Sequence, residues 1–229
     1  MQLFFDFDGT LADSSPGIYA SFEFACTQLN LKPPAFKTFR ESIGPPVQRL
    51  AQRFFPDLTE TDLEAFRLFF RGDYDHYRFR QCDWYAGVKP TIAALGSLPG
   101  TNLAIVTNKP TNPTLELLKT GGLLGWFQLV VGIDYQICLG SGSAFTNKAD
   151  AICFAQAHFE SDASAAFYIG DTPSDRDASH SCGLQFIAAT YGFYRWQQSE
   201  LCTIMNISAI SDLVLLLQYY GSQLYASRY

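Results

Sequence analysis

The chain has 229 residues, of which 48% are hydrophobic and 15% aromatic, enough to bury a core without disulfides or a structural metal. A net charge of −6 at pH 7 and the lack of any Lys/Arg block argue against nucleic-acid binding. The apolar stretch Leu213–Leu217 is far too short to span a membrane, and no signal-peptide pattern precedes Leu3. We therefore expect a cytoplasmic protein with no nucleic-acid or membrane partner, whose six scattered cysteines are reduced, buried thiols.

Short apolar runs that end at polar residues or glycine indicate parallel strands buried on both faces. They are Leu3–Phe5, Leu103–Val106, Leu129–Val131, Ala166–Ile169 and Phe186–Ala189. Helical patterns lie among them at Val88–Leu98, Thr114–Lys119, Ala149–His158 and Ile210–Tyr220. The alternation of strands and helices predicts an α/β fold with a doubly wound parallel sheet and right-handed crossovers.

Residues 14–82 interrupt this alternation because they contain helical patterns only. The predicted helices start at Ser15-Pro16, at Val47 and at Thr59, and the last one runs to Arg80. Aromatic residues at helical spacing predict the core of a small bundle: Phe54, Phe55, Phe66, Phe69 and Phe70. We expect a helical cap over residues 14–82 that covers a site in an α/β core formed by residues 1–13 and 83–229.

The first predicted strand leads directly into Asp6-Phe7-Asp8-Gly9-Thr10. Because side chains alternate along a strand, Asp6 and Asp8 should face the same way while Phe7 turns into the core. Two like charges this close are costly unless a cation or a shared proton compensates them. The pair therefore predicts a metal site, nucleophile and acid/base chemistry, or both.

Other predicted strand ends carry residues that could meet this pair. Thr107 and Asn108 follow Leu103–Val106 and offer a hydroxyl and backbone N–H groups to an anion, and Lys148 precedes a predicted helix. Asp171 and Asp175 follow the strand that ends at Ile169.

Parallel strands of an open sheet end at one edge, where ligands bind, so these side chains should converge. Mg²⁺ takes oxygen ligands and keeps several waters, so Asp6, the Asp8 carbonyl and Asp171 would suffice to bind it.

With these residues in this order along the sequence, the chain resembles members of the haloacid dehalogenase superfamily of phosphotransferases. Its four motifs are matched by Asp6–Leu11, Val106–Lys109, Lys148 and Gly170–Asp175. The resemblance covers essentially the whole chain, includes the helical insert as a C1-type cap, and is closest to the phosphoglycolate phosphatase-like group. The setting of Lys148, in Thr146–Ala149, departs from the Lys-Pro-x-Pro sequence usual in that group.

The resemblance implies a Mg²⁺-dependent phosphatase that acts on a small phosphomonoester of the phosphoglycolate type. Asp6 would be the nucleophile that forms an aspartyl-phosphate, and Asp8 would protonate the leaving oxygen and then deprotonate the attacking water. The phosphoryl group would be held by four residues, Gly9, Thr107, Asn108 and Lys148. The metal would be held by Asp6, the Asp8 carbonyl and Asp171, with Asp175 in support.

The cap should select the substrate. Its loop at Arg40–Pro46 resembles the cap loop that points into the site, where Gly44 permits close approach and Arg49 could pair with a substrate anion.

Asp8 favours phosphate over halide chemistry, because halide leaves without a proton. Two alternatives remain, a phosphosugar mutase similar to β-phosphoglucomutase and a non-catalytic phosphate-binding protein. A monomer or homodimer is expected.

Overall fold

The computed structural model describes residues 1–159 and 166–226, and a six-stranded parallel sheet lies at the centre of the molecule. The spatial order is β5-β4-β1-β6-β7-β8, so β1 lies between β4 and β6. The strands are β1 (Gln2–Phe5), β4 (Asn102–Thr107), β5 (Leu129–Gly132), β6 (Ala166–Gly170), β7 (Gln185–Ala189) and β8 (Met205–Ile207). All five predicted strands are present, and the predicted fold class is confirmed.

The strand of this sheet that the sequence did not predict is β8, at the edge beside β7. Met205 is half-buried, Asn206 is exposed and Ile207 is buried. The segment therefore lacks the continuous apolar run of a strand that is covered on both faces.

The two faces of the sheet carry separate hydrophobic clusters, because successive side chains of β1 point in opposite directions. Leu3 and Phe5 belong to the larger cluster, which includes residues of α5, α6 and α11 and extends into the cap. Phe4 belongs to the smaller cluster, with residues of α8 and α9. These helices are α5 (Val88–Gly96), α6 (Thr111–Thr120), α8 (Lys148–His158), α9 (Pro173–Ser181) and α11 (Asp212–Ala226). Shorter helices are η2 (Leu124–Trp126), α7 (Tyr135–Cys138) and α10 (Gln198–Leu201).

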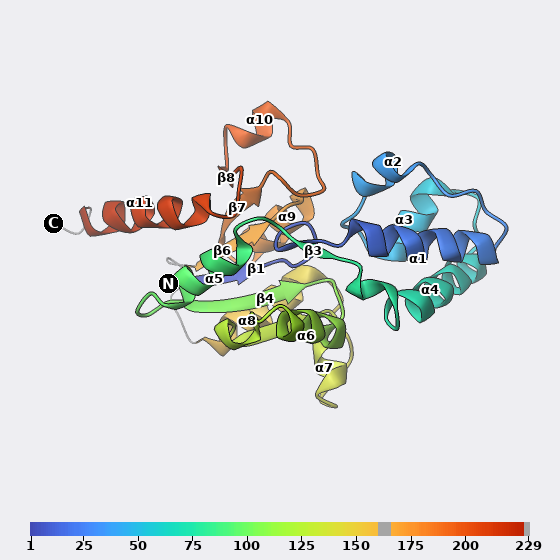
Figure 1. Cartoon of the computed structure of the whole chain (residues 1–229), viewed down its shortest axis with the longest axis horizontal. Helices are drawn as coiled ribbons and strands as arrows, with labels where there is room; N and C mark the ends of the chain where they lie inside the picture. Colours follow the sequence, from blue (N-terminus) through green and yellow to red (C-terminus); the bar gives the residue numbers. More distant parts are fainter. Residues whose placement is uncertain (160–165, 227–229) are drawn as a thin grey trace.

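The segment between β1 and β4 contains the helices of the cap, which Figure 1 shows gathered to one side of the sheet, at the opposite end of the molecule from the C-terminus. They are α1 (Ser15–Gln28), α2 (Phe36–Arg40), α3 (Val47–Phe54), α4 (Glu60–Tyr74) and the 3₁₀ turn η1 (Arg78–Arg80). Phe22 of α1 is central to the bundle: its ring centroid lies 4.7 Å from that of Phe39 and 4.8 Å from that of Phe66. Of the predicted core aromatics, Phe66 and Phe70 are buried, and the others are half-buried against the same cluster.

The predicted helix Thr59–Arg80 is too long, because α4 ends at Tyr74 and the chain then turns. The turn brings Phe79 into the core and returns the chain towards α1, where the Gly17 N–H donates to the Gln81 carbonyl at 3.2 Å. A side chain at Gly17 would clash with the Arg78 carbonyl. Tertiary packing of the returning segment therefore ends the helix.

Cap and core are joined by a short antiparallel ribbon formed by β2 (Ala12–Asp13) and β3 (Asp83–Trp84). The predicted limits of the insert, residues 14 and 82, adjoin this ribbon, and the division into two domains stays a prediction. Both connections leave the core beside the end of β1 (Figure 1). The cap therefore begins a few residues from Asp6 and Asp8.

The cysteines differ from the expectation of reduced, buried thiols. Cys26 is buried, Cys138 and Cys202 are exposed, and Cys153 of α8 forms a disulfide with Cys182 at the end of α9. The two bridged residues are 29 positions apart in the sequence, and the packing of α8 on α9 brings them together, so spacing gave no signal. No helix among the described residues is long and apolar enough to cross a membrane.

Candidate active site at the carboxyl edge of the sheet

Asp6 directly follows β1, and its backbone continues the pairing with β6 through a 2.9 Å hydrogen bond from its N–H to the Ile169 carbonyl. The Phe7 N–H donates to Asp6 Oδ1 at 2.8 Å, and the Phe7 side chain is fully buried, as predicted. Gly9 has a φ of 81°, and a side chain there would clash with the carboxylate of Asp171. The turn after β1 therefore requires glycine at the position where two strand-end loops meet.

Lys148 lies at the first position of α8 and reaches into the site. Its Nζ donates to Asp6 Oδ2 at 2.8 Å and to Asp175 Oδ1, with only 7% of its side chain exposed. The helix starts here because the Asn147 side chain accepts from the Asp150 N–H at 3.0 Å, an N-cap. Burial alone would lower the pKa of Lys148, but Asp175 and Asp6 outweigh it and raise that pKa well above its ordinary value, so the ammonium is retained.

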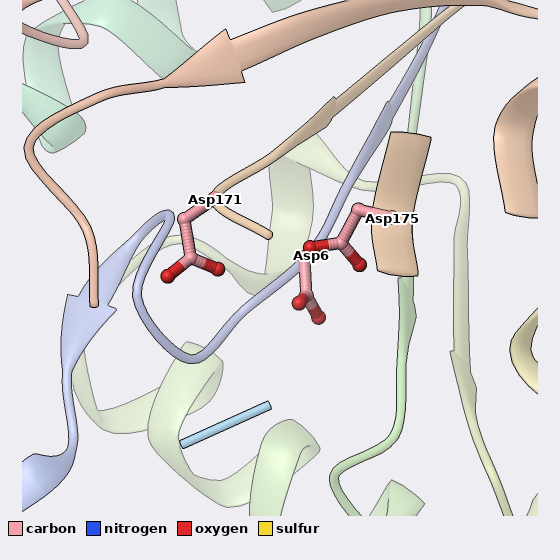
Figure 2. Close-up of side chains that lie close together, drawn as sticks. All are labelled: Asp6, Asp171 and Asp175. Atoms are coloured by element: carbon pink, nitrogen blue, oxygen red, sulfur yellow. The ribbon is translucent and has the colours of Figure 1, made fainter. Parts of the chain in front are cut away.

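Asp6, Asp171 and Asp175 form a buried acidic cluster with one oxygen of each carboxylate within 4.8 Å of the others. Figure 2 shows the three side chains converging from the ends of β1 and β6 and from α9. Asp171 Oδ2 accepts from the Phe193 N–H at 2.8 Å. Asp175 Oδ2 accepts from the Thr172 N–H at 3.0 Å as part of a capping box that starts α9. Backbone N–H groups thus hold both of these carboxylates, that of Asp171 from a distant loop and that of Asp175 from the start of its own helix.

The electrostatics of this cluster suit a divalent cation. Burial and the charge of Asp175 raise the pKa of Asp6 to about 6, against the lowering effect of Lys148. Burial and the charges of Asp175 and Asp6 raise the pKa of Asp171 well above its ordinary value. Lys148 is the one ammonium bonded to the cluster among the described residues, so three carboxylates exceed their compensation. Closely spaced, all-oxygen donors with excess negative charge fit a hard cation such as Mg²⁺.

The Asp8 side chain does not join that of Asp6, although their spacing in the sequence suggests that the two face the same way. Its carboxylate lies outside the acidic cluster and pairs with Lys109, whose Nζ is 3.1 Å from Asp8 Oδ1. Lys109 Nζ also donates to the hydroxyl of Tyr74, the last residue of α4 in the cap. The Lys109 side chain is fully buried, and that of Asp8 is 19% exposed.

Neither Lys109 nor Tyr74 was expected from the sequence to have a role in the site. The available signals were the place of Lys109 directly after Thr107 and Asn108, and the place of Tyr74 at the end of the buried stripe of α4 that includes Phe66 and Phe70. Thr107 is buried at the end of β4, and its Oγ1 accepts from the Lys109 N–H at 3.2 Å.

A cavity of about 620 Å³ lies between cap and core, and Asp6, Asp8, Thr107, Asn108 and Lys148 line its floor together with Asp171. From the cap, Gly44, Arg49, Arg71 and Tyr74 line it. Gly44 has a φ of 140°, and a Cβ there would lie 3.2 Å from Thr172 Cγ2, so this cap loop approaches the core closely. Asp175 is fully buried behind the cavity wall.

Arginines on the cap side of the cavity differ in their partners. Arg67 pairs with Glu64 at 2.6 Å, and Arg71 pairs with Asp75 at 2.8 Å. Arg49 is exposed and has no ion-pair partner among the described residues. Its guanidinium is therefore available to an anion in the cavity.

Comparison with known proteins places the chain in a family. The model of the haloacid dehalogenase-like hydrolases matches residues 3–189, and the chain belongs to this family. It is 28% identical over 222 residues to a phosphoglycolate phosphatase of Pseudomonas fluorescens, covering 90% of this chain and 76% of that one. The predicted assignment to a phosphatase of this superfamily, similar to the phosphoglycolate phosphatases, is confirmed.

Two further similarities extend this result. The chain is 26% identical over 191 residues to the tyrosine-protein kinase PtkA of Mycobacterium tuberculosis, covering 83% of this chain and 62% of that protein. Its fold matches the structure of a haloacid dehalogenase-like family hydrolase from Streptococcus pneumoniae with a TM-score of 0.80 and 25% identity, covering 94% and 97% of the two chains.

Proposed function

We propose that the chain hydrolyses a small phosphomonoester of the phosphoglycolate type, with Mg²⁺, through an aspartyl-phosphate on Asp6. The observation that carries the proposal is the buried Asp6 carboxylate, held on one side by Lys148 Nζ at 2.8 Å and flanked by Asp171 and Asp175. A carboxylate fixed in this way next to an ammonium suits attack on a phosphoryl group, because both the nucleophile and the phosphoryl oxygens need positive charge nearby.

The reaction runs in two displacements. An Asp6 oxygen attacks phosphorus, the P–O ester bond breaks, and the leaving oxygen takes a proton from Asp8. Water then attacks the aspartyl-phosphate, gives its proton to Asp8, and the bond between Asp6 and phosphorus breaks, releasing inorganic phosphate. Asp8 lines the same cavity as Asp6 but bonds to a different lysine, which supports separate roles for the two carboxylates.

Residues around Asp6 would hold the phosphoryl group and the metal. Lys148, the Thr107 hydroxyl, and the backbone at Asn108 and Gly9 would bind the phosphoryl oxygens, where electrostatic stabilisation contributes most. Mg²⁺ would be held by the carboxylates of Asp6 and Asp171 and by the main-chain carbonyl of Asp8, with Asp175 in support. When bound, the ion would supply charge neutralisation for the transferring phosphoryl group.

The position of Arg49 supports the proposal that the substrate carries a second anionic group. It lines the cavity from the cap without an ion-pair partner among the described residues, whereas Arg67 and Arg71 are both paired. A guanidinium binds a carboxylate in a bidentate manner, so a phosphate ester that carries a carboxylate fits this cavity better than a neutral one. Phosphoglycolate has this chemistry.

The test is a panel of phosphate esters assayed for released phosphate with Mg²⁺ and again with excess EDTA. We expect release from small carboxylate-bearing esters, and none with EDTA. Metal-independent release would contradict the Mg²⁺ proposal. Transfer of phosphate back to a sugar phosphate, dependent on a bisphosphate activator and with little phosphate released, would favour the mutase alternative. The cytoplasmic location and the monomeric or homodimeric state stay predictions from the sequence.

A further inference from the structure

The second buried lysine of the site, Lys109, connects the cap to Asp8. Its Nζ lies 3.1 Å from Asp8 Oδ1 and bonds to the Tyr74 hydroxyl, and its side chain is fully buried. The ammonium also lies 4.7 Å from the centroid of the Tyr74 ring and 5.5 Å from that of Phe7. Asp8, Lys109 and Tyr74 therefore form one contact chain from the core loop after β1, through the loop after β4, to the cap.

Two members of this chain, Lys109 and Tyr74, are held in place by further contacts. The Lys109 N–H donates to Thr107 Oγ1 at 3.2 Å, which fixes the loop after β4. The Tyr74 ring is 4% exposed and stacks on Phe70 with centroids 5.3 Å apart, so it cannot move independently of α4. The Asp8 carboxylate is the least buried member, 19% exposed towards the cavity.

Burying an ammonium is costly, and replacing a whole buried ion pair by apolar residues is often neutral or stabilising, so stability alone does not account for the pair of Lys109 with Asp8. Lys109 is separate from the phosphoryl-binding lysine, because Lys148 bonds to Asp6 and Asp175 while Lys109 bonds to Asp8. Its bonds to Asp8 and Tyr74 fix the direction in which the Asp8 carboxylate points. A carboxylate that transfers a proton depends on such orientation, since a displacement of about 1 Å can cost roughly 100-fold in rate.

We propose that Lys109 is a positioning residue through which Tyr74 of the cap orients Asp8, so that Asp8 meets the leaving oxygen when α4 is seated against the core. The proposal rests on the function proposed above, in which Asp8 transfers the proton. It assigns Tyr74 and Lys109 to one step, protonation of the leaving group, and gives the cap a part in the reaction as well as in substrate choice.

The test uses esters that differ in their need for a proton donor. An alkyl phosphate such as 2-phosphoglycolate releases an alkoxide that must be protonated, whereas 4-nitrophenyl phosphate releases a stable phenolate. The ratio kcat/KM reports steps up to release of the leaving group. Loss of Asp8 orientation should therefore lower kcat/KM for the alkyl ester and leave that for the aryl ester nearly unchanged.

For Tyr74→Phe, which keeps the buried ring, we expect kcat/KM for the alkyl ester to fall about 10-fold and that for the aryl ester to fall less than about 3-fold. Lys109→Met should give about a 100-fold selective loss, and the double variant should lose no more than Lys109→Met alone, because the residues act in one chain. Tyr77→Phe is the matched control, since Tyr77 is 69% exposed, and it should change neither ester.

Equal losses for both esters in Tyr74→Phe and Lys109→Met, or a rise in KM alone, would overturn the positioning role and assign these residues to binding or stability. Asp8→Asn separates this failure from failure of the proposed function. If Asp8→Asn spares the aryl ester but the two positioning variants do not, only the positioning role is wrong. If Asp8→Asn lowers both esters equally, or the unmodified enzyme hydrolyses neither, the proposed function fails and the positioning role fails with it.

Discussion

The carboxyl edge of the sheet and the helical cap line the same cavity, but they are built in different ways. At the sheet edge, the chemical groups follow strands or start helices, and side-chain N-caps at Asn147 and Thr172 begin the helices that carry Lys148 and Asp175. The cap contributes Gly44, Arg49 and Tyr74 from separate segments, and aromatic rings pack the cap helices together. In the proposed function, the edge supplies the reacting groups, while the cap selects the substrate and orients Asp8 through Tyr74.

The largest expected loss of activity at the sheet edge follows from a substitution of Asp6. Asp6→Asn should lower phosphatase activity on the order of 10⁴-fold or more, because the nucleophile is lost while the surrounding bonds can still form. Asp57→Asn, at an exposed cap position, is the control and should be fully active. Steady-state phosphate release measures both, with circular dichroism to verify folding. Substantial turnover by Asp6→Asn would refute the nucleophile role.

The cap is expected to depend on its aromatic core. Phe66→Ala should reduce the free energy of unfolding by about 3–5 kcal/mol, because Phe66 is fully buried against Phe22 and Ala leaves a cavity. Leu68→Ala, on the same helix and 57% exposed, should change it by less than about 0.5 kcal/mol. Urea denaturation provides the comparison. A loss below about 1 kcal/mol for Phe66→Ala would mean that the ring cluster does not hold the cap together.

Metal and pH should act on the sheet edge together. The folded-state pKa of Asp6 is raised from 3.8 to about 6 by burial, and that of Asp171 is raised as well. Their contribution to stability in the metal-free protein is therefore fully present below the unfolded pKa and is lost as pH rises through the folded values. Because Mg²⁺ competes with these protons, it should raise Tm by about 5 °C at pH 7.5 and by less at pH 5.

Thermal unfolding with Mg²⁺ and with EDTA at both pH values measures this effect without reference to activity. Asp57→Asn should respond to Mg²⁺ like the unmodified protein, because Asp57 is exposed and lies outside the acidic cluster. A Tm shift that is equal at the two pH values, or larger at pH 5, would show that these carboxylates do not bind the metal.

The smallest expected effect belongs to Arg49. Arg49→Ala should raise KM about 10-fold for an ester that carries a carboxylate and leave kcat nearly unchanged, because the guanidinium binds a remote group of the substrate. An ester of similar size without the carboxylate should show no change in KM. Arg53→Ala, at an exposed position of the same helix, is the matched control. An unchanged KM for both esters would remove Arg49 from substrate binding.

Much of the sheet edge could be predicted from the sequence because its signals are local. Apolar runs mark buried strands, and polar residues directly after them come together when the strands are parallel. Asp6, Thr107 and Asp171 each follow such a run and line one cavity. The strand β8 was missed because Ile207 is its only buried residue, so it lacks the continuous apolar run that marks the other strands of the sheet.

What the sequence did not reveal depends on contacts between distant segments. Tyr74 and Lys109 are 35 positions apart, and the disulfide partners Cys153 and Cys182 are 29 apart, so no local pattern specifies either pairing. The spacing of Asp6 and Asp8 indicated a shared site but not that each would bond to a different lysine. Which charges pair is decided by the packing of cap on core, and that information lies outside any single motif.

The most direct test of the proposed reaction is detection of the phosphorylated enzyme. The protein is mixed with ³²P-labelled substrate and Mg²⁺, quenched in acid within the first turnover, and digested for peptide mapping. We predict acid-stable, hydroxylamine-sensitive label on the peptide that contains Asp6, and no label in Asp6→Asn. Turnover without label on that peptide, or label on another residue, would contradict an aspartyl-phosphate on Asp6.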